Sequence, residues 1–240
     1  MEQTFFEADY TVDTIDLNCY GRLRTSRLLE LVQVYSGLHA ARLGFGGDRL
    51  GEQNLAWVTV RQQIEISRLP GAGEIMHFAT WPGRAMHSLF PRHMLITDQN
   101  GAELMRSCVL WVIMEKESRT MILPGKYGID FPSSDREPVL PMPRLPKKML
   151  PEIKRSSFTV PFSYVDIVGH MNNTRYADAA ENILDAPREG KALRQLLIEY
   201  AHEIRMDETM ELIVGAEADS YTVQGVKDGA PVFTLCLKYE

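Results

Sequence analysis

One pattern of elements occurs twice along this chain, and the duplication limits the folds that it can adopt. Residues 10–12 match residues 158–160 at an offset of 148 positions, and the same offset places Gly21 on Gly169. Each copy reads as a strand, a turn and a helix, followed by strands with alternating apolar residues. We therefore expect an α+β protein made of two similar modules.

The first copy carries the clearer helix signal. Apolar residues recur every three or four positions from Leu28 to His39, which predicts a long amphipathic helix with Ser26 as its cap and an end near Gly44. Period-two patterns then predict strands at 55–66, 74–81, 88–97 and 102–114.

In the second copy, Asn172 or Asn173 is the candidate cap of a helix that ends before Pro187. Strands are predicted at 195–205, 211–218, 220–226 and 232–239. Between the copies, proline and charged residues are frequent, as in a linker. The predicted parts are an N-terminal module at 1–130, a proline-rich linker at 131–153 and a C-terminal module at 154–240.

Composition argues against several classes of protein. The 32 acidic residues outnumber the 26 basic residues, whereas nucleic-acid-binding surfaces are normally basic. No apolar run reaches the ~20 residues of a membrane-spanning helix, and the first ten residues carry no basic leader. The cysteines Cys19, Cys108 and Cys236 are scattered, which argues against a disulfide framework or a zinc site. We expect a cytoplasmic protein that binds no nucleic acid, does not insert into membranes and holds no metal.

Most of the chemically suggestive residues lie in one segment, 158–184. Asp166 and His170 come just before the predicted second helix, where backbone N–H groups stabilise developing negative charge. Asp166 is equally suited to cap a turn, and an isolated histidine is more often structural than catalytic. The first copy has Asn18 and Arg22 at the matching positions, so the second copy alone is equipped for catalysis.

The spacing D-x-x-x-H-x-N-N-x-x-Y resembles the active-site segment of the acyl-acyl carrier protein thioesterases, the tandem hotdog enzymes of plants and bacteria. The residues that carry this resemblance are Asp166, Gly169, His170, Asn172, Asn173 and Tyr176. Similar stretches at 57–59, 65–70, 109–112 and 199–203 extend it over nearly the whole chain.

This resemblance implies a fold and an activity. The fold is a tandem (double) hotdog, in which each half has a long helix wrapped by an antiparallel β-sheet and the two sheets join edge to edge. The activity is hydrolysis of the thioester of acyl-acyl carrier protein to free fatty acid and carrier protein, which ends fatty acid synthesis and needs no cofactor. An acyl-CoA thioesterase and a non-catalytic acyl-binding hotdog protein are the alternatives, and formation of a homodimer stays open.

The resemblance also implies roles for single residues of the second module. Asp166 and Glu203 activate water, or Asp166 attacks the thioester directly, while His170 orients the reacting groups. Glu203 is expected on a strand that projects it toward the other two. The residues expected to support the oxyanion are Gly169, Asn172 and Asn173. Plant relatives have Asn and Cys where this chain has Val168 and Ile204, which excludes a cysteine nucleophile at that position.

The first module is expected to select the acyl chain, through a pocket at Leu31, Val32 and Tyr35 of its helix. Two basic clusters are candidates for docking an acidic carrier protein, although ordinary surface charge is the simpler explanation for any one of their residues. The clusters consist of Arg22, Arg24 and Arg27, and of Lys147, Lys148, Lys154 and Arg155.

Overall fold

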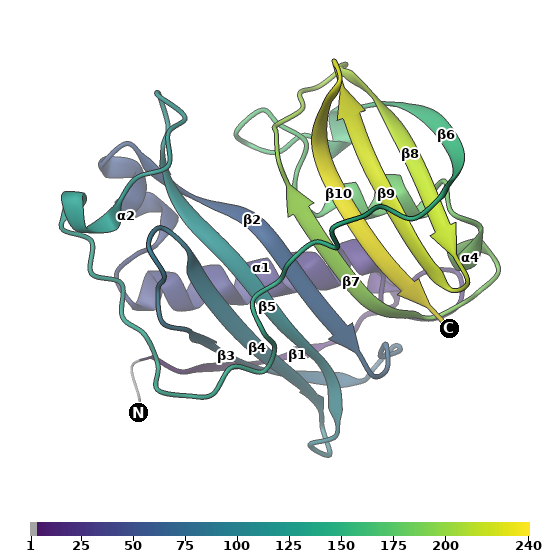
Figure 1. Cartoon of the computed structure of the whole chain (residues 1–240). Coiled ribbons are helices and arrows are strands. Elements are labelled where there is room, and N and C mark those ends of the chain that lie inside the picture. The colour runs from purple at the N-terminus through teal and green to yellow at the C-terminus, as the bar shows by residue number, and fades with distance from the viewer. Residues whose placement is uncertain (1–3) are drawn as a thin grey trace.

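A computed structural model describes residues 4–240, so the first three residues of the predicted N-terminal module lie outside it. Within the described residues, ten strands form one antiparallel sheet in the order β1-β3-β4-β5-β2-β7-β10-β9-β8-β6 (Figure 1). The strands of the first half are β1 (Phe6–Thr11), β2 (Leu55–Ile66), β3 (Ile75–Pro82), β4 (Phe90–Asp98) and β5 (Glu103–Glu115). Those of the second half are β6 (Glu152–Thr159), β7 (Leu193–Tyr200), β8 (Thr209–Glu217), β9 (Ser220–Lys227) and β10 (Ala230–Tyr239).

The two halves meet where β2 pairs with β7 in antiparallel register, from Arg61 opposite Glu199 to Glu65 opposite Gln195. The strand order on one side of this junction mirrors the order on the other side. Each half places its second strand, β2 or β7, at the shared edge. Ile64 pairs with Leu196 at the junction, and both side chains are buried in the common core. The predicted edge-to-edge union of the sheets is therefore confirmed.

The predicted repeat offset of 148 residues is also confirmed in detail. Short 3-10 helices at Thr14–Asp16 and Phe162–Tyr164 follow β1 and β6 at this spacing. Isolated bridges between Leu17 and Leu23 and between Val165 and Met171 then close equivalent loops. The two copies thus share a loop geometry, although the side chains that these loops carry differ.

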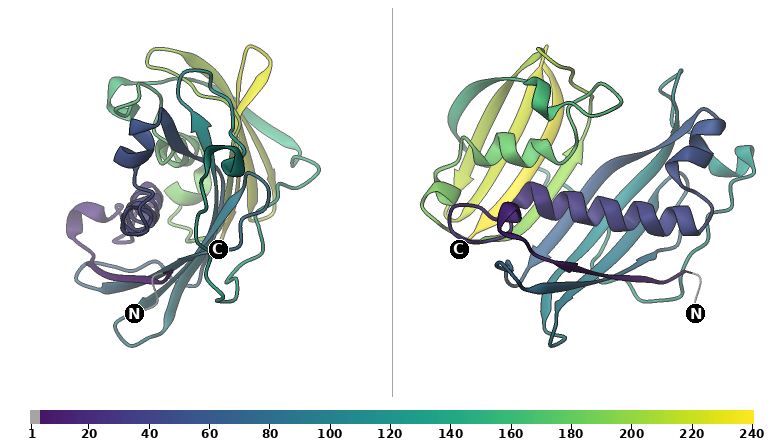
Figure 2. Two further views of the ribbon diagram at one scale, coloured as in Figure 1. Left: turned by 90° about the vertical axis from the view of Figure 1, so that its left-hand side faces the viewer. Right: turned by 180° about the vertical axis from the view of Figure 1, so that it is seen from behind.

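Helices α1 (Thr25–Arg42) and α3 (Arg175–Glu181) lie on the same face of the sheet (Figure 2, right). The N-cap of α1 is Arg24 and Ser26 is buried inside the first turn, so the predicted Ser26 cap is wrong. A short helix, α2 (Gly47–Glu52), follows α1. No helix in the described part of the chain is long and apolar enough to cross a membrane.

The helix of the second half is much shorter than predicted. It has seven residues, and a separate turn, α4 (Asp185–Arg188), follows it. Pro187 has no N–H to donate to the carbonyl of Ile183 and would clash with that carbonyl in a continuous helix. The carbonyl accepts a hydrogen bond from Lys154 Nζ instead, at 2.9 Å. The helix layer therefore consists mostly of α1.

The proline-rich segment between the halves crosses the face of the sheet opposite the helices (Figure 1). The 3-10 helix Pro124–Tyr127 precedes this segment, and the chain then has no helix or strand from 131 to 151. Leu140 anchors this segment, because it is buried against Cys108 and Leu110 of β5. Strand β6 begins at Glu152, so its first two residues lie inside the predicted linker 131–153. The division of the chain at this linker stays a proposal.

A buried carboxyl group links the two halves at the end of α3. Glu181 Oε1 accepts hydrogen bonds from Thr25 Oγ1 of α1 at 2.7 Å and from Tyr239 Oη of β10 at 3.0 Å. Burial raises the pKa of Glu181, and the two hydrogen bonds only partly oppose this effect. The folded protein therefore holds this proton more tightly than the unfolded chain does.

This raised pKa predicts a loss of stability with rising pH. The free energy of unfolding should fall as pH increases from the unfolded glutamate pKa of about 4.3 through the higher folded value, by about 1.4 kcal/mol for each pH unit between the two. Glu181→Gln keeps the acceptor oxygen and removes the charge, so it should flatten this fall and stabilise the protein near pH 8. Urea unfolding from pH 4 to 8 measures the effect, with the exposed Glu217→Gln as control. Parallel curves for wild type and Glu181→Gln would contradict the assignment.

Candidate active site

The loop between the 3-10 helix of the second half and α3 is a tight turn built by its own backbone. The N–H of Asp166 donates to the carbonyl of His170 at 3.0 Å, and the N–H of Gly169 donates to the carbonyl of Asp166 at 3.0 Å. Gly169 has φ +83°, a left-handed conformation that glycine adopts without strain. No atom lies within 4 Å of a Cβ built there, so the backbone conformation and not space requires the glycine.

His170 and Glu203 are brought together by a short backbone pairing. His170 forms an isolated bridge with Arg205, and the N–H of Met171 donates to the carbonyl of Ile204 at 2.8 Å. The imidazole, whose side chain is 9% exposed, places Nε2 3.0 Å from Glu203 Oε2. The sequence therefore identified two groups that do contact each other.

Glu203 does not lie on a strand, which corrects the sequence prediction. Strand β7 ends at Tyr200, because the N–H groups of Ala201 and His202 both turn to the carbonyl of Val232. Glu203 follows in an irregular segment and is about half exposed.

A residue of the first half completes this pair, and sequence reasoning missed it. Arg119 Nη1 donates to Glu203 Oε1 at 2.5 Å, so each carboxylate oxygen of Glu203 has a partner. Arg119 lies in the tight turn after β5 and has φ +56°. Nothing in the local sequence marks this arginine, since its role depends on the contact between the two halves.

Asp166 lies on the same loop as His170 but is not hydrogen-bonded to the pair. Its Oδ1 accepts from the N–H of Val168 at 3.0 Å, which is the turn-capping use that the sequence left open. Among the described residues, Oδ2 has no hydrogen-bond partner. Burial raises the pKa of Tyr176, and the negative charges of Glu203 and Asp166 raise it further, so both carboxylates lie near this phenol.

The two asparagines of the loop have different roles. Asn172 Oδ1 accepts from the N–H of Thr174 at 3.0 Å and from its Oγ1 at 2.8 Å, which fixes the start of α3. Asn173 Nδ2 reaches Thr59 Oγ1 of β2 at 3.4 Å, and its carbonyl accepts from Tyr200 Oη at 3.0 Å. The backbone N–H of Asn173 has no acceptor among the described residues.

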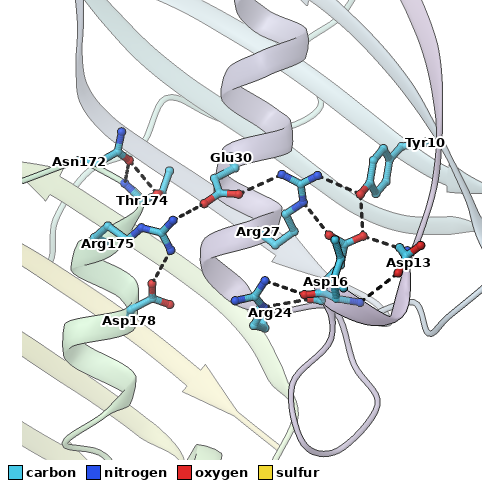
Figure 3. Close-up of polar contacts among 11 residues, drawn as sticks. Tyr10, Asp13, Asp16, Arg24, Arg27, Glu30, Asn172, Thr174, Arg175 and Asp178 are labelled. Carbon is cyan, nitrogen blue, oxygen red and sulfur yellow. Dashed lines mark hydrogen bonds and ion pairs between the residues drawn. The ribbon is translucent and has the colours of Figure 1, made fainter. Parts of the chain in front are cut away.

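A chain of ion pairs holds this loop against α1 (Figure 3). Arg175 Nη2 lies 2.9 Å from Glu30 Oε1, and its Nη1 lies 3.0 Å from Asp178. Glu30 also pairs with Arg27, whose Nε lies 2.9 Å from buried Asp16. Burial opposes ionisation of Asp16, but hydrogen bonds and the charge of Arg27 outweigh it and lower its pKa. The network therefore fixes the second-half loop on the first-half helix.

A cavity of about 410 Å³ begins beside this loop and extends along α1. Its walls are mostly apolar, with a few polar groups, and come mainly from the first half. The lining residues that matter most below are Glu30, Val34, Gly37, Ala40, Arg92 and Asn172. From Glu30 to Ala40, α1 rises by about 15 Å, so the cavity is elongated.

The predicted pocket residues lie on the other side of the helix. Leu31, Val32 and Tyr35 are buried in the main core, where the Tyr35 ring lies 4.5 Å from that of Phe78 between centroids. They do not line the cavity, because Val34 and Gly37 are on the opposite face of α1. Both faces of this helix are partly apolar, so periodicity alone could not select one.

Most residues of the two basic clusters make hydrogen bonds or ion pairs within the protein. Arg27 and Arg155 form ion pairs with neighbouring carboxylates, at Asp16 and at Glu152 respectively. Arg22, Arg24 and Lys154 donate to backbone carbonyls. Lys147 and Lys148 remain exposed.

Position 204, where the resemblance raised the question of a cysteine nucleophile, is occupied by a fully buried isoleucine, Ile204. Cys19 is exposed, while burial raises the pKa of Cys108 to about 12 and that of Cys236 to about 11. Within residues 4–240, no group of three or more His, Cys, Asp or Glu side chains is arranged to hold a metal ion.

Comparison with known families agrees with this geometry. Residues 3–123 match the family model of the acyl-ACP thioesterase N-terminal domain, and residues 147–228 match that of its C-terminal domain. The chain belongs to the acyl-acyl carrier protein thioesterase family. The predicted family and the α+β hotdog fold are thereby confirmed.

Known proteins of this family are distant in sequence but similar in fold. The chain is 24% identical over 224 residues to a chloroplastic palmitoyl-acyl carrier protein thioesterase of Arabidopsis thaliana, covering 86% of this chain and 54% of the relative. It thus spans about half the length of such curated relatives. An acyl-ACP thioesterase from Bacteroides thetaiotaomicron superposes with a TM-score of 0.82 at 21% identity, over the whole of both chains. The 12:0-ACP thioesterase from Umbellularia californica gives 0.79 at 18% identity, over 99% of this chain and 97% of that one.

The contact of Arg119 with Glu203 predicts that the first half helps to position the acid of the second. Arg119→Gln should lower the rate of thiol release from acyl carrier thioesters by up to about 10²-fold, because small displacements of reacting groups are costly. Arg119→Lys should restore part of the rate. The matched control is Lys116→Gln in the same turn, and unchanged melting temperatures would show that all variants fold. Full activity of Arg119→Gln would contradict a positioning role.

Proposed function

We propose that this protein hydrolyses the thioester of an acyl-acyl carrier protein to a free fatty acid and carrier protein. The observation that carries the proposal is the His170–Glu203 contact on a loop whose next residues, Asn172 and Thr174, line an elongated apolar cavity. A thioester carbonyl at the loop would leave its acyl chain in that cavity. Membership of the acyl-ACP thioesterase family supports the same reaction.

Asp166 is the better placed of the two carboxylates to activate water. Its Oδ2 has no hydrogen-bond partner among the described residues, whereas His170 and Arg119 bind the two oxygens of Glu203. Asp166 takes a proton from water as the hydroxide attacks the thioester carbon. The C–S bond then breaks, and the protonated Asp166 returns the proton to the departing sulfur, so the carrier leaves as a thiol. Direct attack by Asp166 is the alternative, and it forms a mixed anhydride that water cleaves.

The developing oxyanion requires donors, and the loop offers one. The Asn173 N–H has no acceptor among the described residues, and Gly169 lets the loop approach a substrate closely. One such donor contributes roughly 3 kcal/mol in enzymes with oxyanion holes. His170, held by Glu203, orients the groups around it.

The partner and substrate are tested together. Purified protein is incubated with matched acyl-carrier and acyl-CoA thioesters while free thiol is followed. Faster release from the carrier supports the proposal, and equal or faster release from CoA favours an acyl-CoA thioesterase. Tight acyl binding without release would indicate a non-catalytic acyl-binding protein.

Asp166→Asn should reduce turnover by about 10²–10⁴-fold while folding and acyl-carrier binding persist, because the substitution keeps the shape and removes the base. Glu203→Gln should have a smaller effect, since the amide oxygen of Gln still accepts from Arg119 and only the contact with His170 is changed. Steady-state thiol release and a binding titration measure both variants, with exposed Glu217→Gln as control. Near-native activity of Asp166→Asn together with Glu203→Gln would disprove the catalytic assignment.

We further propose that the acyl chain lies along the Val34, Gly37 and Ala40 face of α1, rather than at Leu31, Val32 and Tyr35. The first half then selects the chain and the second half cleaves it. Gly37 is the most direct probe, because no atom lies within 4 Å of a Cβ built there. A larger side chain would enter the cavity without a clash at its first atom.

Gly37→Leu should shift the product profile toward shorter fatty acids, since filling one methylene of a pocket changes discrimination by about 1–3 kcal/mol. It should not destabilise α1, because glycine is a poor helix former. Leu31→Met and Ile183→Val are the comparison variants, and gas chromatography of the released acids is the measurement. If Leu31→Met moves the chain-length optimum and Gly37→Leu does not, the original pocket prediction is correct and this one is wrong.

A further inference from the structure

A buried cation lies on the wall of the acyl cavity. Arg92 of β4 lines the cavity, and the residue is 4% exposed. Its Nη1 donates to His39 Nδ1 at 2.9 Å and lies 3.5 Å from Thr80 Oγ1. Both partners are uncharged acceptors here, because a ring nitrogen that accepts a hydrogen bond carries no proton.

No carboxylate neutralises this guanidinium among the described residues. Burial lowers the pKa of Arg92 to about 10, which still leaves it positively charged at neutral pH. The carbonyl groups at the end of α1 do not accept hydrogen bonds from the guanidinium either. Those of His39, Ala40 and Ala41 accept from the backbone N–H groups of residues 43–45. Buried charges in proteins are normally paired, so this one lacks its usual partner.

The opposite end of the cavity provides an internal comparison. Glu30 also lines the cavity, but it is paired with Arg27 and Arg175. Glu30 lies near the catalytic loop, whereas Arg92 contacts His39 in the last turn of α1. The unpaired cation is therefore at the end where the far end of an acyl chain would lie.

A plain hydrocarbon chain is a poor match for this end. Filling the cavity with alkyl groups would remove water from the guanidinium and offer no acceptor in return, which is costly for a charged group. A carboxylate would pair with it through parallel N–H···O contacts, the geometry that arginine favours.

We propose that the cavity selects acyl chains with a carboxylate at their far end, so that the substrate is the half-thioester of an α,ω-dicarboxylic acid and Arg92 is its specificity residue. The inference deepens the proposed thioester hydrolysis and rests on it. The reaction is unchanged, and the released product carries a carboxylate at each end.

The test compares matched carriers loaded with octanoyl, decanoyl or dodecanoyl chains and the same chains with the terminal methyl replaced by a carboxylate. Wild-type protein should cleave one carboxyl-terminated chain with kcat/KM at least about tenfold above its plain counterpart. Arg92→Met should abolish or reverse this ratio, and Arg106→Met, an exposed arginine of β5, should leave it unchanged. A wild-type preference for plain chains at every length overturns the proposal, as does an unaltered ratio in a folded Arg92→Met protein.

A binding measurement separates this inference from the proposed activity. Pantetheine amides of the same chains cannot be cleaved, and calorimetry gives their affinities for wild type and Arg92→Met. If no thioester is hydrolysed but the carboxylated amide binds wild type more tightly, the hydrolysis proposal fails and the specificity inference stands. Equal affinities of the two amides for wild type overturn the inference, whether or not Arg92→Met folds.

Discussion

The pairing of β2 with β7 is the contact on which the rest of the structure depends. It makes one sheet from two halves, and it places their helices on one face of that sheet. Through this arrangement the loop of the second half that carries Asp166 and His170 lies against α1 of the first. The cavity along α1 of the first half therefore opens beside the Asp166–His170 loop of the second half.

Residues far apart in sequence make up the candidate site. His170 and Glu203 meet through a two-residue backbone pairing, and Arg119 reaches the same carboxylate from the other half. Asp166 belongs to the turn that carries His170 but keeps one oxygen free of the described hydrogen bonds. The two carboxylates therefore differ: both oxygens of Glu203 have partners, whereas Oδ2 of Asp166 has none among the described residues, and our proposal for water activation by Asp166 rests on this difference.

The charged side chains around α1 differ in whether they are paired with an opposite charge. Around α1, Arg27 and Arg175 are each paired with carboxylates, and these ion pairs hold the loop in place. Arg92 is equally charged and more deeply buried, yet among the described residues its contacts are to neutral atoms. Because a buried charge without a counterion is unfavourable, the difference points to a function for Arg92 rather than to stability.

The sequence alone determined the duplication, the strand pattern and the reactive loop, since these depend on local periodicity, turn residues and short spacing. It did not determine the length of the second helix, which ends at Glu181 because the chain is extended at Leu184, well before Pro187, or the place of Glu203 beyond the end of β7. It also left open which side of α1 borders the cavity, because apolar residues occur on both sides. Nothing in the local sequence marks Arg119 or Arg92. Their surroundings are decided by the tertiary structure, because a distant segment brings Glu203 to Arg119, whereas no described segment brings a carboxylate to Arg92.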